Sequence, residues 1–228
     1  MKLLSIALLL SFFSISYSYA QDFEYARITG SDIELKNTQL DSNANAMVIR
    51  EFGTAAVQLD NTTGKTYIDF QYHVRIKIFN KEGFNHGNIV IPLRIYRDDE
   101  DEIKELKATT INFVNGQLVK TELDKKKVFN EKKNKYVSLT KFTMPNLMDG
   151  SIVEYSYRLY SPYIFNFKTW EFQSDIPKLH SEYIANIPAI YNYNVSLRGA
   201  QKLAKQNAEL KKECLMIAGN KIDCSKMT

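Results

Sequence analysis

The stretch IDFQYHVRIKI, residues 68–78, decides the fold class of this 228-residue chain. Apolar residues stand at every second position, and polar residues fill the positions between them. Because successive side chains of a strand point to opposite faces, this spacing predicts a long β-strand with one buried face. That face comprises Ile68, Phe70, Tyr72, Val74, Ile76 and Ile78. The alternate positions, His73 among them, are expected to face solvent.

Turn and strand patterns continue along the chain. Residues 80–83 (NKEG) predict a turn, and residues 88–95 the strand that returns from it. Asn115-Gly116 lies between two apolar runs. It predicts a two-residue hairpin, because a type I′ turn needs positive φ at both central residues. Further strands are expected over residues 136–143, 151–160 and 191–197, with a turn at 145–150.

Helical patterns are few. Ser31 and Asp32, followed by Glu34, can cap a single turn. Residues 200–212 have a helix-favouring composition between strand-like stretches, so their conformation stays open. Many strands separated by turns, without alternation of strand and helix, predict an all-β fold. We expect an antiparallel β-sandwich of long strands with at most one or two short helices.

The first twenty residues have the three regions of a secretory signal peptide. Lys2 supplies the positive charge, residues 3–13 the apolar region, and residues 18–20 (SYA) a small-x-small cleavage site before Gln21. The apolar region is shorter than the about 20 residues that a permanent membrane helix needs. We therefore expect an exported protein, periplasmic or extracellular after cleavage, without a stable membrane span.

These patterns divide the chain into four parts. We expect a signal peptide over residues 1–20, an N-terminal segment over 21–45 and a β-sandwich domain over 46–200. Residues 201–228 are expected to begin a further β region that is truncated, because the strand-like end has no closing turn.

The formal net charge of +4 indicates no particular partner. The lysine-rich residues 120–135 are interleaved with acids and accompanied by no arginine or aromatic pattern, so no nucleic-acid partner is expected. The acidic residues 98–105 lack the residue order of a calcium loop and are expected to form an exposed loop.

Motifs of catalytic or metal chemistry are absent from the sequence. The three histidines, His73, His86 and His180, form no H-x-H or H-E-x-x-H pair. There is no G-x-S-x-G elbow and no phosphate loop. No catalytic residue, metal site or cofactor is therefore expected.

Cys214 and Cys224 are the only cysteines, an even number in a chain built for export. If residues 214–217 pair with 221–224, the two Cβ atoms lie opposite each other on a hairpin, at the separation that a disulfide needs. We expect a Cys214–Cys224 disulfide. The alternative, one cysteine acting as a nucleophile, has no neighbouring residue that would activate the thiol.

Aromatic residues are densest between residues 155 and 172, where eight occur. One interpretation packs them in the core or against a neighbouring domain. The other makes them a platform that stacks on sugar rings or grips an extended peptide. The platform would comprise Tyr163, Phe165, Phe167 and Trp170.

Seven sequence blocks, taken in order, resemble the bacterial family called domain of unknown function 3857. The blocks are VRIKI with NKEG (74–83), NG (115–116), KFTMPN (141–146), GSIVEY (150–155), SPYIF (161–165), WEFQSDIP (170–177) and SEY (181–183). The resemblance implies an exported β domain that precedes a transglutaminase-like domain of the same longer protein. Family members with an intact catalytic part carry Cys, His and Asp in that order.

This chain departs from that order, because both cysteines follow every histidine. No catalytic residue can be transferred, and we do not expect an enzyme. The leading hypothesis is a non-catalytic exported β domain that positions or binds substrate for a downstream transglutaminase-like or peptidase-like domain. The alternative is a free-standing glycan- or peptide-binding module that uses the aromatic segment around Trp170.

Overall fold

The computed structural model describes residues 23–37, 40–60, 62–211, 215–217, 220–223 and 226–227. Its helical elements are short: α1 (Gly30–Glu34) and the 3-10 helices η2 (Lys81–Gly87) and η3 (Lys125–Lys127). The larger sheet contains β1 (Ala46–Leu59), β2 (Thr66–Ile78), β5 (Glu102–Val114), β6 (Gln117–Glu122), β9 (Ile152–Ser161), β10 (Ser181–Pro188), β11 (Leu210–Lys211) and β14 (Lys226–Met227). The smaller contains β3 (Asn88–Tyr96), β4 (Asp99–Glu100), β7 (Phe129–Asn134) and β8 (Val137–Thr143). A separate pair comprises β12 (Leu215–Ile217) and β13 (Asn220–Asp223).

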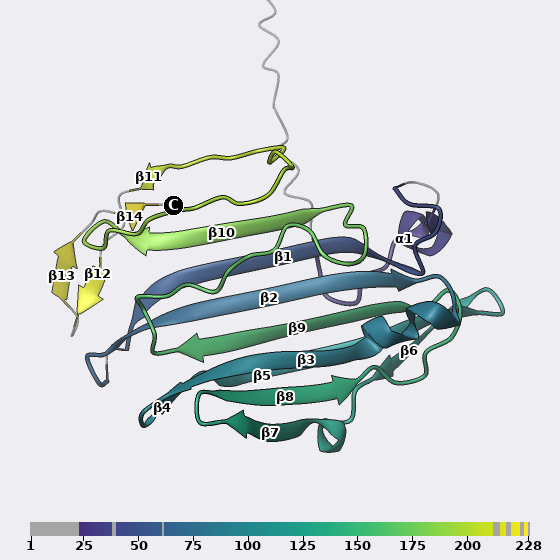
Figure 1. The fold of residues 1–228 in the computed structure, drawn as a ribbon, viewed down its shortest axis with the longest axis horizontal. Helices are drawn as coiled ribbons and strands as arrows, with labels where there is room; N and C mark the ends of the chain where they lie inside the picture. The colour runs from purple at the N-terminus through teal and green to yellow at the C-terminus, as the bar shows by residue number, and fades with distance from the viewer. Residues whose placement is uncertain are drawn as a thin grey trace, which may run out of the picture.

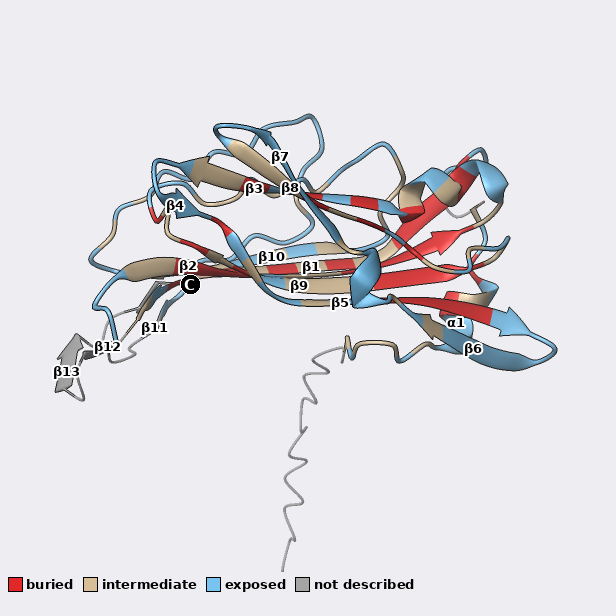
Figure 2. Ribbon diagram, turned by 90° about the horizontal axis from the view of Figure 1, so that it is seen from below, coloured by how far each residue is buried: buried red, intermediate tan, exposed pale blue. Residues whose placement is uncertain are grey.

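The two larger sheets lie face to face, which confirms the predicted β-sandwich (Figure 1). The eight-stranded sheet has the order β11-β14-β10-β1-β2-β9-β5-β6, and the four-stranded sheet the order β4-β3-β8-β7. Figure 2 shows the small sheet covering one face of the large sheet, while α1 lies on the opposite side.

The core lies between the sheets, where β2 and β9 face β3. Phe70, Val74, Ile76 and Ile78 of β2 are buried there, as the alternation predicts. Residues 88–95 do form a strand, but it does not return along β2. Helix η2 carries the chain into the second layer, so that β3 pairs with β8 instead.

The predicted hairpin at Asn115-Gly116 is confirmed. Val114 pairs with Gln117, and the two turn residues have φ values of 50° and 78°. The turn before β9 is also confirmed, with positive φ at Asn146 and Gly150. Few residue types tolerate positive φ, so these residues fix the geometry of the two turns. The turn geometry in turn sets the register of the strand that follows.

One ladder of the large sheet departs from the expected antiparallel arrangement. β1 and β10 pair in parallel, from Glu51 opposite Ser181 to Ala56 opposite Asn186. The chain leaves the sheet after β9 and returns on the far side of β1 (Figure 1). Parallel neighbours need such a crossover, and local patterns do not reveal it.

Two expectations for the C-terminal part need correction or remain open. Residues 191–197 form no strand, and Val195 and Leu197 are largely exposed, because alternation without a neighbouring strand leaves the backbone unpaired. The described residues of 200–212 contain no helix. Cys214 and Cys224 lie outside the described residues, so their disulfide stays a prediction. β12 and β13 do pair as a hairpin, but Ile217 lies opposite Asn220 and not opposite residue 221 as expected.

Candidate ligand groove

An open groove of about 740 Å³ lies between β3, the start of β8 and the chain that follows β9. This volume falls within the range of roughly 300–1,000 Å³ that is typical of small-molecule sites. Charged and aromatic side chains both line it, among them Arg94, Tyr96, Asp101, Tyr136, Tyr163, Phe167 and Lys168. We call this feature the ligand groove.

Asp101 is the buried charge of the ligand groove, with 4% of its surface exposed. Its backbone N–H donates to the Arg94 carbonyl at 2.9 Å, and its Oδ2 accepts from the Arg94 N–H at 3.0 Å. Its Oδ1 is buried and has no hydrogen-bond partner among the described residues. A buried acceptor without a donor lowers the stability of a protein by about 1–3 kcal/mol, and by more if the group is charged. Such an atom therefore requires an explanation.

Two cations line the groove, and one of them, Lys168, stands beside this carboxylate. Lys168 Nζ lies 3.7 Å from Asp101 Oδ2 and donates to the Pro92 carbonyl at 3.2 Å. Burial lowers the pKa of Lys168, and the Asp101 charge opposes that effect. The Arg94 guanidinium lies 5.3 Å from the centre of the Tyr163 ring. In the Asn166 amide orientation that satisfies both its ends, the oxygen accepts from Arg94 at 3.2 and 3.3 Å.

The structure separates the four residues of the predicted aromatic platform. Tyr163 and Phe167 line the ligand groove, and the Tyr163 hydroxyl donates to the Asp99 carbonyl. Phe165 is 89% exposed and lies outside the groove lining. Trp170 packs against the core, where its ring lies 5.1 Å from that of Tyr183, nearly parallel to it.

The Trp170 contact is part of a polar cluster between the sheet and the crossover. Its Nε1 donates to Ser181 Oγ at 3.1 Å, and Ser181 Oγ donates to Glu51 at 2.8 Å. Glu51 also accepts from the Tyr72 hydroxyl and from Lys178 Nζ, both at 2.7 Å. Burial raises the pKa of Tyr72 far above its ordinary value. Because both oxygens of the Glu51 carboxylate accept hydrogen bonds from this chain, the cluster holds the crossover against the sheet.

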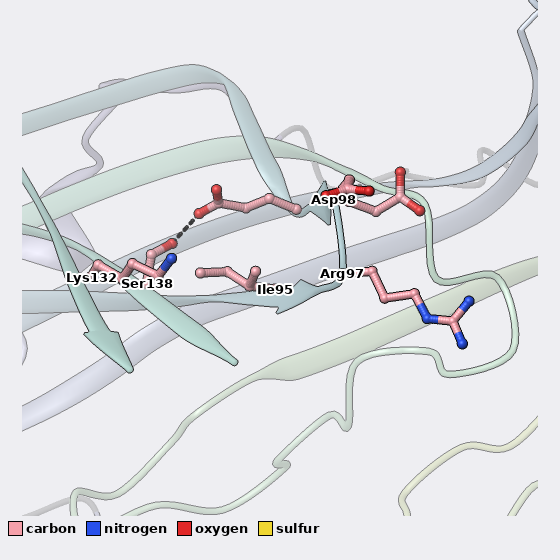
Figure 3. Close-up of a pocket in the computed structure, with 7 residues that line it drawn as sticks. Ile95, Arg97, Asp98, Lys132 and Ser138 are labelled. Atoms are coloured by element: carbon pink, nitrogen blue, oxygen red, sulfur yellow. Dashed lines mark hydrogen bonds between the residues drawn. The ribbon is translucent and has the colours of Figure 1, made fainter. Parts of the chain in front are cut away.

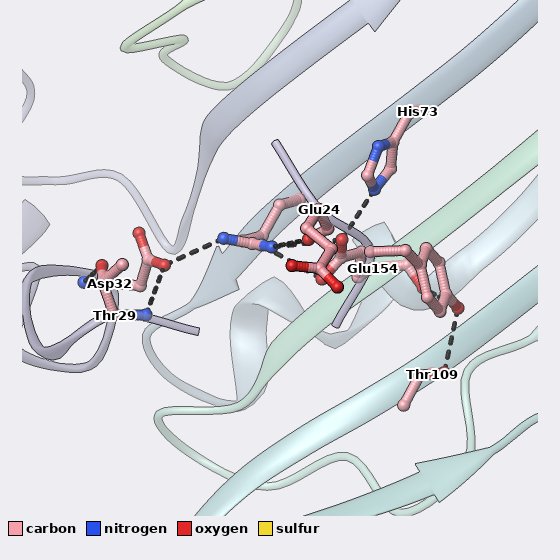
Figure 4. Close-up of polar contacts among 8 residues, drawn as sticks. Glu24, Thr29, Asp32, His73, Thr109 and Glu154 are labelled. Carbon is pink, nitrogen blue, oxygen red and sulfur yellow. Dashed lines mark hydrogen bonds and ion pairs between the residues drawn. The ribbon is translucent and has the colours of Figure 1, made fainter. Parts of the chain in front are cut away.

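A second buried cluster lies on the opposite face of the large sheet (Figure 4). Arg75 donates to Asp32 at 2.9 Å and to both oxygens of Glu154 at 3.1 and 3.2 Å. His73 bonds Glu154 at 2.6 Å and stacks on Phe23 with ring centroids 3.9 Å apart. The expectation that the alternate positions face solvent is therefore wrong for His73, Arg75 and Lys77, whereas Gln71 is exposed as expected.

The reason for this correction is the N-terminal segment, which covers the sheet face that the alternation left polar. Tyr25 reaches Thr109 at 2.9 Å, and burial raises the Tyr25 pKa to about 12. Lys77 Nζ donates to the carbonyls of Ile33 and Gly150, and burial lowers its pKa. The charges have partners within the cluster, which indicates a structural role in holding the segment on the sheet.

A smaller pocket of about 250 Å³ lies at the turn between β3 and β4 (Figure 3). Ser138 donates to Glu100 there, while Arg97 points away from that pair. The lining residues Asp98, Asp99 and Glu100 are exposed. Exposed carboxylates are hydrated without cost, so this pocket is a weaker candidate than the ligand groove.

The acidic run 98–105 shows what sequence reasoning missed. It was expected to be an exposed loop, yet Asp101 within it is buried and residues 102–114 form β5. Arg94 and Lys168 gave no signal either, because each stands singly in the sequence. The one pattern that could have indicated the position of Arg94 is the apolar alternation of β3. It places Arg94 next to buried Leu93, near the end of the strand.

Two kinds of feature are absent from the part of the chain that the structure describes. No group of three or more His, Cys, Asp or Glu in that part of the chain is placed to hold a metal ion. No helix in the same part is long and apolar enough to cross a membrane.

Comparison with protein families gives one match. The model described as "Domain of Unknown Function with solved-structure structure (DUF3857)" matches residues 67–213. A search of the curated proteins found no match.

Comparison with solved structures gives distant likenesses. A proposed protease from Parabacteroides distasonis ATCC 8503 is 10% identical with a TM-score of 0.49, over 80% of this chain and 34% of the other. A two-domain M1 zinc metallopeptidase bound to L-tryptophan is 9% identical with a TM-score of 0.32, over 80% and 38%. Yeast LTA4 hydrolase with bestatin is 9% identical with a TM-score of 0.29, over 85% and 28%. The chain thus spans about a third of the length of these proteins.

Proposed function

Because the chain belongs to the family of the domain of unknown function 3857, we propose that it is a non-catalytic binding domain that positions substrate for a transglutaminase-like or peptidase-like catalytic domain. In this proposal the ligand groove is the binding site. The protein is exported, and the catalytic partner is a downstream part of the same longer protein.

The observation that supports this proposal is the buried Oδ1 of Asp101, which has no partner among the described residues. Ligand sites combine apolar and aromatic walls with a few polar groups that fix orientation. The ligand groove has both components, the aromatic walls in Tyr163 and Phe167 and the polar groups in Arg94, Asp101 and Lys168.

A free-standing binding module remains the second candidate. The specific observation in its favour is that the groove is lined by segments of this one domain, between Pro92 and Thr169. This candidate now rests on Tyr163 and Phe167 rather than on Trp170, because Trp170 packs against Tyr72 and Tyr183.

The test is a thermal-shift screen of the mature chain with cell-wall glycan fragments and short peptides. A ligand at 100 times its Kd should stabilise the protein by about 2.7 kcal/mol. Phe167→Ala, which alters the groove wall, should abolish the shift, while the matched control Phe165→Ala should retain it. A ligand whose shift survives Phe167→Ala and other groove substitutions would contradict the proposed site.

The positioning role needs a separate measurement on the full-length protein with its catalytic domain. Phe167→Ala should raise KM and leave kcat unchanged, because substrate capture is lost and the reacting groups are untouched. An unchanged KM would favour the free-standing module.

A further inference from the structure

We propose that the ligand groove binds a neutral saccharide. This inference rests on the proposed binding function and names its ligand class. Three properties of the groove carry it: the placement of its charges, its aromatic surfaces and the blocked edge of β3.

The charges of the groove favour a neutral ligand that both donates and accepts hydrogen bonds. The free Oδ1 of Asp101 needs a donor, whereas Arg94 and Lys168 are donors only. A cationic ligand would meet the like charges of Arg94 and Lys168 in the groove, and an anionic ligand would meet the Asp101 carboxylate. A hydroxyl group can donate to Asp101 and accept from a neighbouring cation, and adjacent hydroxyls on one ring can do both.

The aromatic rings supply the second surface that a sugar requires. Tyr96 and Tyr136 are about half exposed, at 52% and 54%, and both line the groove. Phe167 packs edge-on against Tyr193, with ring centroids 4.8 Å apart, which fixes its orientation. The face of an aromatic ring carries partial negative charge, so it attracts the weakly positive C–H groups on one face of a sugar ring.

The edge of β3 argues against an extended peptide. Such a peptide would add a strand by pairing with free backbone groups. The backbone groups of Arg94 that face this edge are already bonded to Asp101. Two residues earlier, on the same edge, Pro92 has no N–H, and its carbonyl accepts from Lys168. The edge therefore lacks the alternating donors and acceptors of a ladder.

The experiment is titration of the mature chain with cellotriose and chitotriose, followed by two-dimensional NMR and calorimetry. At least one trisaccharide should bind at millimolar concentration or better and shift the signals of residues that line the groove. The comparison ligand is an uncharged peptide with blocked ends, which should not bind there.

Two groove variants and one control locate the site. Asp101→Asn keeps an oxygen for the Arg94 N–H and replaces the free acceptor with an amide donor. It should weaken saccharide binding about tenfold or more. Tyr136→Ala changes a half-exposed ring and should also weaken binding, even if Asp101→Asn proves unstable. Asp98→Asn removes the same charge from the exposed turn outside the groove and should bind as the parent does.

The outcomes separate the saccharide inference from the binding function. Absence of binding by both trisaccharides, or binding that neither Asp101→Asn nor Tyr136→Ala weakens, overturns the saccharide inference. If the peptide binds instead and the groove variants weaken it, the saccharide inference fails while the binding function stands. If no ligand of any class depends on the groove, both fail.

Discussion

Gly53 and Trp170 meet so closely that the glycine cannot carry a side chain. A Cβ placed on Gly53 would lie 2.2 Å from Cζ3 of Trp170 and under 3 Å from two further atoms of the indole. Real Cβ atoms do not approach other atoms so closely, and the indole is a rigid group that cannot give way locally. The indole of Trp170, the only tryptophan in the sequence, therefore occupies the space that a side chain at Gly53 of β1 would fill.

We expect Gly53→Ala to displace Trp170 and to lower the free energy of unfolding by about 1–3 kcal/mol, as overpacking does. Urea denaturation measures the loss, and tryptophan emission should shift to longer wavelength as the indole becomes hydrated. Gly30→Ala is the matched control, since nothing lies within 4 Å of a Cβ there. Equal stability of the two variants would contradict the contact.

Glu154 offers a second test of single residues. It is fully buried and bonded to Arg75 and His73, so Glu154→Gln leaves a buried guanidinium with only part of its counter-charge. We expect a loss of about 3 kcal/mol in the free energy of unfolding. Glu102→Gln, which removes the exposed partner of Lys104, should change that free energy by about 0.5 kcal/mol or less. Similar losses for both variants would refute the special role of the buried cluster.

Single residues also mark the limit of sequence reasoning. Alternation correctly assigned Val74 and Ile76 to the core face, because burial of apolar side chains follows the strand period. It could not assign Arg75 or Glu154, because their burial depends on a segment more than 40 positions away that covers them. Asp101 was also missed, because a charged residue in an acidic run is expected to face solvent and its burial depends on the neighbours that the fold brings to it.

At the scale of elements, local turn chemistry was the most reliable guide. Asn115-Gly116 fixed one hairpin, because its conformation depends on two adjacent residues alone. The failure at residues 191–197 has the opposite cause, since a strand exists only where a partner strand lies beside it. On its other edge from β2, β1 pairs with β10, whose sequence SEYIANIP has no regular alternation of apolar and polar residues.

The hairpin yields a prediction about β5 and β6. Gly116 has a φ of 78°, which a β-branched residue resists, so Gly116→Val should lower the free energy of unfolding by about 1 kcal/mol or more. Chemical denaturation measures the change. Gln117→Val, one position later and in the strand, serves as the control and should cost less. An unchanged midpoint for Gly116→Val would count against the turn.

At the scale of the whole molecule, the sequence predicted the class of fold but not the contacts between distant segments that complete it. Strand periodicity and the scarcity of helix patterns predicted a sandwich, which the two stacked sheets confirm. The parallel ladder and the covering N-terminal segment arise from contacts between distant parts of the chain. The ligand groove is of that kind too, since Lys168, from the segment that follows β9, lies against Asp101 at the end of the β3–β4 hairpin.

Export is a prediction about the whole molecule. The pattern of residues 1–20 leads us to expect cleavage between Ala20 and Gln21 when the gene is expressed in a bacterial host with its leader intact. Intact-mass measurement of the product outside the cytoplasm should give an N-terminus at Gln21. A product that retains Met1 and stays in the cytoplasm would disprove export.

The parallel ladder between β1 and β10 determines when the fold can be completed. Ser181 meets Glu51 across 130 positions of sequence, so one edge of β1 stays open until nearly the whole domain has emerged from the ribosome or the translocation pore. Such high contact order slows folding, and an open edge strand recruits other chains. The nascent domain consequently needs protection against aggregation during this interval, and a chain ended before residue 181 should accumulate as insoluble material even though most of its strands are present.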